Sequence, residues 1–233
     1  MSTDVLTRPA TKPLQARFIF QLIVIPAVIT LCVTLLRLAG ELSHWSTRWF
    51  SPETGGIIPS GWSFLIGVTW LPIPFGAYFA LKLLHNGMGP RNVGAAVVYS
   101  LVGVGIMCVG YLGVPLALRY LHAQWPRGLV FIWLYMVTAA MVQLPGWYRL
   151  SRTLLYYGFA SRIPIVIVMF MALHGNWGTH YDYVGMPPEV HEAGFFWLAL
   201  GPQLIFWTSF TVVLGMLSGS VAAALYGKIQ GTG

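Results

Sequence analysis

The chain has 233 residues, of which 57% are hydrophobic and 8% are charged. A soluble domain usually carries roughly 25% charged residues, so the composition excludes a soluble globular enzyme, a disordered tail and a disulfide-stabilised scaffold. Lys and Arg outnumber Asp and Glu, which gives a formal net charge of +7. Because these cations lie mostly between apolar runs, they indicate orientation in a lipid bilayer and contact with anionic head groups, and no nucleic-acid partner is expected.

Six segments of the sequence are apolar, and each approaches the roughly 20 residues that a helix needs to cross a bilayer. They are residues 18–39, 62–84, 93–118, 128–148, 153–174 and 195–226. Lipid offers no hydrogen bonds to the backbone, so each segment is expected to be helical. The sequence therefore predicts an all-α fold, a polytopic integral membrane bundle of about six transmembrane helices.

The distribution of Lys and Arg predicts the orientation of this bundle. With the N-terminus in the cytoplasm, eight of these residues lie on the inner side and four on the outer side. The positive-inside rule then places both termini in the cytoplasm, in a multi-pass protein of an inner or plasma membrane. We expect a cytoplasmic N-terminal segment over residues 1–17, a single transmembrane domain over 18–226 and a cytoplasmic tail over 227–233.

The fifth segment contains Arg162 and Pro164, and the sequence leaves its start open. If the helix spans 153–174, Arg162 lies inside the bilayer, where a charged group costs at least ~2.5–3.5 kcal/mol and marks a candidate functional residue. Arg162 is then a candidate for binding a lipid phosphate or a substrate carboxylate, or it has a purely structural role. If the helix begins near Ile163, with residues 153–161 at the cytoplasmic interface, Arg162 lies among head groups instead.

Histidine and carboxylate side chains gather on the predicted outer side. Five of the six histidines lie there, and no metal-binding motif such as HExxH is present. Glu41 follows Arg37 by four residues, so it either forms a local ion pair or is held ionised as an acid or base. Histidine and carboxylate groups suit acid–base chemistry as well as a divalent metal cofactor such as Zn²⁺. The candidate catalytic residues are Glu41, His174, His180 and Asp182; the alternative is a solvated, hydrogen-bonded outer loop.

Two further patterns concern the packing of the helices. Residues 70–76 contain two prolines and a glycine, which predict a kink in the second segment, either beside a cavity or for packing alone. Gly215, Gly219 and Ala223 are spaced by four residues in the sixth segment. Small residues on one face allow close approach of another helix, either within the chain or in a homo- or hetero-oligomer.

Three functions are consistent with these features. The first is a small membrane-embedded enzyme that acts on a lipid or isoprenoid-like substrate, with a polar site at the outer face. The second is a non-catalytic subunit of a membrane complex, and the third is a transporter or channel component that uses Arg162. The segment centres contain no Asp or Glu, which argues against ion-coupled transport. The enzyme and the subunit rank about equally, and the enzyme is the working hypothesis.

Overall fold

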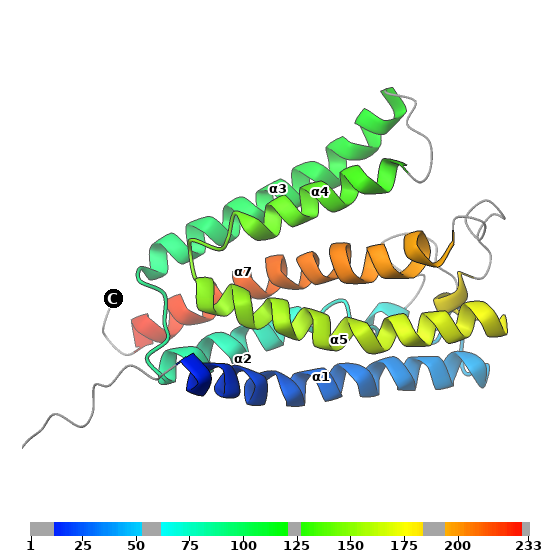
Figure 1. Cartoon of the computed structure of the whole chain (residues 1–233), viewed down its shortest axis with the longest axis horizontal. Coiled ribbons are helices and arrows are strands. Elements are labelled where there is room, and N and C mark those ends of the chain that lie inside the picture. Colours follow the sequence, from blue (N-terminus) through cyan, green and yellow to red (C-terminus); the bar gives the residue numbers. More distant parts are fainter. Residues whose placement is uncertain (1–11, 53–61, 121–126, 184–193, 230–233) are drawn as a thin grey trace, which may run out of the picture.

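The computed structural model of the chain describes residues 12–52, 62–120, 127–183 and 194–229. Within these ranges all regular structure is helical and no strand is present, which confirms the all-α prediction. The six longest helices form one bundle (Figure 1): α1 (Lys12–Leu42), α2 (Pro72–His85), α3 (Val93–Tyr120), α4 (Arg127–Met141), α5 (Tyr148–Gly175) and α7 (Thr208–Ile229). Four short elements complete the described fold: the 3-10 turns η1 (Ser63–Ile66) and η2 (His180–Asp182), and the π-helical segments η3 (Phe196–Leu200) and η4 (Pro202–Trp207).

Successive long helices run in alternating directions along the bundle (Figure 1). The helices α1, α3 and α5 run one way, and α2, α4 and α7 run the other way. As a result, α1 begins and α7 ends at the same end of the bundle, named here the α1-start end. The opposite end is named the η2 end, because η2 lies there beside the last turns of α1 and α5.

Four helical stretches are long and apolar enough to cross a membrane: Arg17–Leu42, Val93–Gly113, Tyr148–Gly175 and Phe196–Ile229. They coincide with the first, third, fifth and sixth predicted segments. Large apolar side chains cover their outward faces; Phe20 and Val109, for example, are 65% and 71% exposed. Such surfaces are expected of helices that face lipid, because water-soluble monomers rarely expose large contiguous apolar patches.

The second predicted segment is not a continuous span. In place of one helix over residues 62–84, the chain forms η1 and then α2, whose 14 residues extend about 21 Å at 1.5 Å per residue. Pro72 begins α2, at a position where a missing backbone N–H is tolerated. The predicted segment is thus interrupted at the first of its two prolines, which starts a short helix instead of bending a long one.

The fourth predicted segment, residues 128–148, is also divided. The helix α4 has 15 residues, or about 22 Å, and turns over residues 142–147 separate it from α5. Pro145 lies in these turns, where its lack of a backbone N–H does no harm. Both α2 and α4 are shorter than the roughly 30 Å hydrocarbon core of a bilayer.

The fifth predicted segment belongs to one continuous helix, α5, which contains Pro164. The alternative start near Ile163 is therefore wrong, and residues 153–161 are helical. Arg162 lies about 21 Å from the first residue of α5, close to its middle. Only 4% of Arg162 is exposed, so its side chain points into the bundle and does not extend to an end of the helix.

Glycines let α7 pack closely against α2 and α5. A Cβ on Gly76 of α2 would clash with the Gly215 carbonyl oxygen, and a Cβ on Gly215 would clash with Leu154 of α5. A Cβ on Gly219 would lie 2.8 Å from the Gly76 carbonyl oxygen. Gly215, Gly219 and Ala223 are all buried. The stripe thus agrees with the alternative of packing within the chain, and the predicted oligomer contact stays a prediction.

Candidate functional site

A stripe of polar side chains follows one face of α1. Its members are Thr30, Thr34, Arg37 and Glu41, each at most 8% exposed. Their spacing of three or four residues places them on one face of the helix. The stripe faces α5, since the Thr30 and Tyr157 hydroxyl oxygens are 2.7 Å apart. It reaches the η2 end at Glu41.

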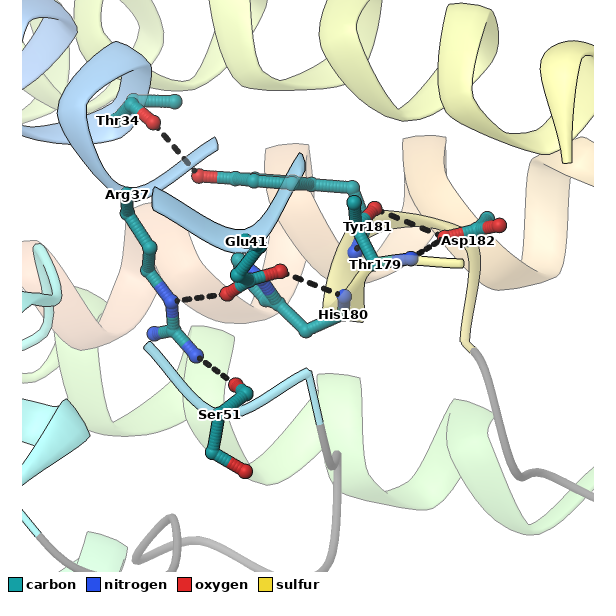
Figure 2. A network of polar contacts seen from close by, with 8 residues as sticks. All are labelled: Thr34, Arg37, Glu41, Ser51, Thr179, His180, Tyr181 and Asp182. Atoms are coloured by element: carbon teal, nitrogen blue, oxygen red, sulfur yellow. Dashed lines mark hydrogen bonds and ion pairs between the residues drawn. The ribbon is translucent and has the colours of Figure 1, made fainter. Parts of the chain in front are cut away.

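The Glu41 carboxylate joins α1 to η2 (Figure 2). It accepts hydrogen bonds of 2.9 Å from Nε of Arg37 and 2.9 Å from the backbone N–H of His180. Nδ1 of His180 lies 2.7 Å from one carboxylate oxygen and 2.8 Å from the other. The Glu41 side chain is fully buried, whereas 10% of the Arg37 side chain and 21% of the His180 side chain are exposed. The predicted ion pair of Arg37 and Glu41 is confirmed, and it shares its carboxylate with a histidine.

Local sequence signals position the turn that carries His180. Asn176 and Gly178 follow α5 with positive φ angles of 47° and 70°, which Asn and Gly adopt most readily. Thr179 then caps η2, because its hydroxyl oxygen accepts the Tyr181 backbone N–H at 3.3 Å. In return, Asp182 accepts the backbone N–H of Thr179 at 2.6 Å and its hydroxyl at 2.8 Å. This is a reciprocal capping arrangement of the kind that fixes helix starts. Asp182 therefore orders the turn, and His180 alone among the outer-loop candidates contacts Glu41.

Two more contacts hold α1 in place, one to this turn and one to the segment that follows α1. The Tyr181 hydroxyl donates to the Thr34 carbonyl oxygen at 3.1 Å, and Nη2 of Arg37 donates to the Ser51 carbonyl oxygen at 3.4 Å. The polar network in Figure 2 thus connects α1, the segment after it and η2. Arg37 and His180 contact the Glu41 carboxylate directly, and Ser51 joins the network through Arg37.

Burial of the His180 ring disfavours its charged form, and the contact with Glu41 favours one tautomer. Burial lowers the pKa of His180 below its ordinary value of 6.5; the hydrogen bond to Glu41 acts against this, and the charge of Arg37 acts with it. An ionised carboxylate can only accept hydrogen bonds, so Nδ1 carries the proton and Nε2 keeps its lone pair. An imidazole oriented by a carboxylate in this way can act as a general base or ligate a metal.

His174 lies apart from this contact. It is exposed near the end of α5, and its Nδ1 lies 2.8 Å from the Phe170 carbonyl oxygen. Across the described ranges no group of three or more His, Cys, Asp or Glu side chains could hold a metal ion. Zn²⁺ usually takes three or four protein ligands, so the described residues do not fit a zinc site. Glu189, His191 and Glu192 lie outside the described residues.

Arg162 forms a second buried polar centre. Its Nη1 lies 3.5 Å from Oε1 of Gln203, and its guanidinium carbon lies 5.4 Å from the centroid of the Trp207 ring. Its Nε is buried and has no hydrogen-bond partner among the described residues. Leaving a buried donor unsatisfied costs about 1–3 kcal/mol. The position agrees with the interior alternative for Arg162, and its predicted role in substrate binding stays a prediction.

The sequence interpretation missed the side chains that complete the two centres. The Tyr181 hydroxyl supports the Glu41 contact by bonding to the backbone carbonyl oxygen of Thr34, and Gln203 and Trp207 face Arg162. The sequence contains one pattern for each centre that could have indicated these side chains. The spacing of the polar residues on α1 continues back from Glu41, and Gln203 is the single amide side chain in residues 195–226.

Comparisons with protein-family models, with curated proteins and with solved structures found no match for the chain.

Proposed function

We propose that the protein is a membrane-embedded enzyme that uses His180 and Glu41 for acid–base chemistry on a lipid or isoprenoid-like substrate. The observation that carries this proposal is the contact of His180 Nδ1 with both carboxylate oxygens of Glu41, at 2.7 and 2.8 Å. With Nδ1–H held in place, Nε2 accepts a proton from a substrate hydroxyl or a water molecule. The carboxylate stabilises the imidazolium that forms, and the imidazolium then returns the proton to the product.

In this proposal the chain crosses an inner or plasma membrane six times, with both termini in the cytoplasm. The alternating directions of the helices support six crossings (Figure 1), with α2 and α4 as the two short ones. Lys82, Arg91 and Arg149 lie at or next to helix ends at the α1-start end. The positive-inside rule makes that end cytoplasmic and the η2 end outer.

Exposed aromatic side chains at the η2 end support a lipid-like substrate. Trp45, Trp49 and Trp62 follow α1 and are 47%, 39% and 45% exposed. Tryptophan concentrates at the boundary between lipid and water. His180 is therefore expected at the depth of the head groups, where the polar end of an amphiphile is within reach.

The test compares lipid extracts of the cells from which the chain comes, after removal of its gene and its restoration as wild type or variant. We expect one lipid species to change when the gene is removed and to recover with the wild type. His180→Ala should lower the recovery rate by roughly 10²–10⁴-fold, the range for loss of a general acid or base. Mass spectrometry of the extracts measures the change.

His174→Ala is the matched control, because it removes an exposed imidazole at the same end of the bundle. It should restore the lipid profile fully when both variants are present in the membrane at the wild-type amount. A His180→Ala variant that restores the profile as well as His174→Ala does would exclude the proposed acid–base role.

A transporter or channel component that uses Arg162 is the second candidate. It is favoured by one observation, a cation buried near the middle of a candidate span. The non-catalytic subunit ranks below these two, because Gly215 and Gly219, which suggested a contact with a partner, pack within the chain. Flux through liposomes that requires Arg162 and not His180 would decide for transport.

A further inference from the structure

Arg162 carries a buried positive charge without an anionic partner among the described residues. The two acidic side chains in those ranges are Glu41 and Asp182, and neither forms an ion pair with Arg162. Glu41 pairs with Arg37, and Asp182 accepts the N–H groups of Gly178 and Thr179. A charge in the interior of a membrane span is normally paired or serves a functional purpose.

One edge of the Arg162 guanidinium forms a hydrogen bond, and the other edge has no partner among the described residues. Nη1 points to Gln203 at a distance of 3.5 Å, a long and weak contact. Nε has no partner within the described part of the chain although its exposed area is nearly zero. In arginine the Nε side of the guanidinium is one of the planar edges that bind a carboxylate or phosphate through two parallel hydrogen bonds.

The wall opposite Arg162 is the π-helical segment η4, which contributes both Gln203 and Trp207. The π-helix is rare and is found frequently at functional sites, because its wider turn alters which side chains face a neighbour. Here it aims an amide and an aromatic ring at the same cation. Trp207 is partly exposed, and the guanidinium of Arg162 lies over its ring.

We propose that Arg162, with Gln203 and Trp207, binds an oxyanion, the carboxylate or phosphate group of a lipid-like ligand. The anion receives hydrogen bonds from the Nε edge and neutralises the guanidinium, while the amide of Gln203 remains on Nη1. The anion reaches Arg162 when the Trp207 ring moves aside. The proposal deepens the proposed function, because it makes the lipid-like ligand an anion. It rests on that function only in taking the ligand to be a lipid.

The test measures binding to the purified full chain in detergent micelles by native mass spectrometry. The first pair of probes is oleate and its neutral methyl ester, and the second is dioleoyl phosphatidate and the phosphate-free dioleoylglycerol. Inorganic phosphate is the fifth probe. We expect oleate or phosphatidate to bind one per chain and their neutral counterparts to bind at least tenfold more weakly. Arg162→Gln should weaken binding of the anions by roughly 10–100-fold, as for loss of a charged hydrogen-bond donor.

Gln203→Glu is a second variant, which tests the same site if the Arg162→Gln variant fails to fold. It places a carboxylate next to Arg162, within the chain, and should abolish binding of the added anion while raising the melting temperature. Arg149→Gln is the matched control, because Arg149 is an exposed cation at the α1-start end of α5, and it should bind the anions as the wild type does.

The outcomes separate the possible ligands. Binding of inorganic phosphate alone, with the same dependence on Arg162, would support the oxyanion site and assign it a soluble ligand. Equal binding of oleate and methyl oleate, or unchanged anion binding by both Arg162→Gln and Gln203→Glu, would overturn the proposal. Binding is measured without turnover, so a loss of catalysis in His180 variants has no bearing on the result.

Discussion

Glu41→Leu is expected to lower the melting temperature of the protein by about 10 °C or more. The substitution leaves the Arg37 guanidinium in a site where only 10% of its side chain is exposed, without the carboxylate that neutralises it. Breaking a buried ion pair by removing one partner costs about 3–5 kcal/mol, and each kcal/mol corresponds to roughly 2–4 °C for a chain of this size. The backbone N–H of His180 also loses its acceptor. Thermal unfolding in detergent micelles measures the effect.

The control is the double variant Arg37→Met and Glu41→Leu. Replacing both partners of a buried pair by apolar residues of similar size is often neutral or stabilising, so most of the lost stability should return. The difference between the single and double variants isolates the interaction between the two side chains. A Glu41→Leu variant as stable as the wild type would mean that the carboxylate does not join α1 to η2.

Gly76→Ala is expected to destabilise the bundle by about 1–3 kcal/mol, the range for overpacking a tightly packed core. The added Cβ would clash with the backbone carbonyl oxygen of Gly215. Because the obstacle is backbone, no side-chain rotation can relieve the clash, and α2 must move away from α7. The melting temperature in micelles should fall by several degrees.

Gly105→Ala is the matched control for this substitution. Gly105 lies in α3, and a Cβ there would meet no atom within 4 Å. Its replacement should leave the melting temperature unchanged or raise it slightly, since alanine is the better helix former. If Gly76→Ala behaved like Gly105→Ala, the close contact of α2 with α7 would be wrong.

The apolar runs predicted where four of the candidate spans lie, because hydrophobicity persists over the length of a long helix. They did not predict where α2 begins or where α4 ends. Leu71 is 4% exposed although it precedes α2, and the turns over residues 142–147 are also largely apolar. Turns buried against neighbouring helices are as hydrophobic as the helices they connect, so hydropathy does not separate them.

Both partners of the Glu41–His180 contact were selected from the sequence, but their pairing was not. They are 139 residues apart, and they meet because α1 and α5 run in the same direction and end at the same end of the bundle (Figure 1). His174 was selected for its place in the same outer loop. It lies instead within the last turns of α5, on an exposed face, and only the course of the chain beyond Asn176 distinguishes it from His180.

The most direct test of the central claim is a titration of the His180 ring by nitrogen NMR in micelles, assigned with a His180→Asn variant. The fold favours neutral imidazole, so the folded-state pKa lies below the unfolded value of 6.5. Burial is the main cause of the lowered pKa of His180; the charge of Arg37 lowers it further, whereas the charges of Glu41 and Asp182 raise it. Stability that depends on His180 is then complete above pH 6.5 and declines as the pH falls through the lowered pKa. At pH 7 we expect protonated Nδ1 and unprotonated Nε2. A ring that is cationic at pH 7, or protonated only on Nε2, would contradict the carboxylate-oriented base.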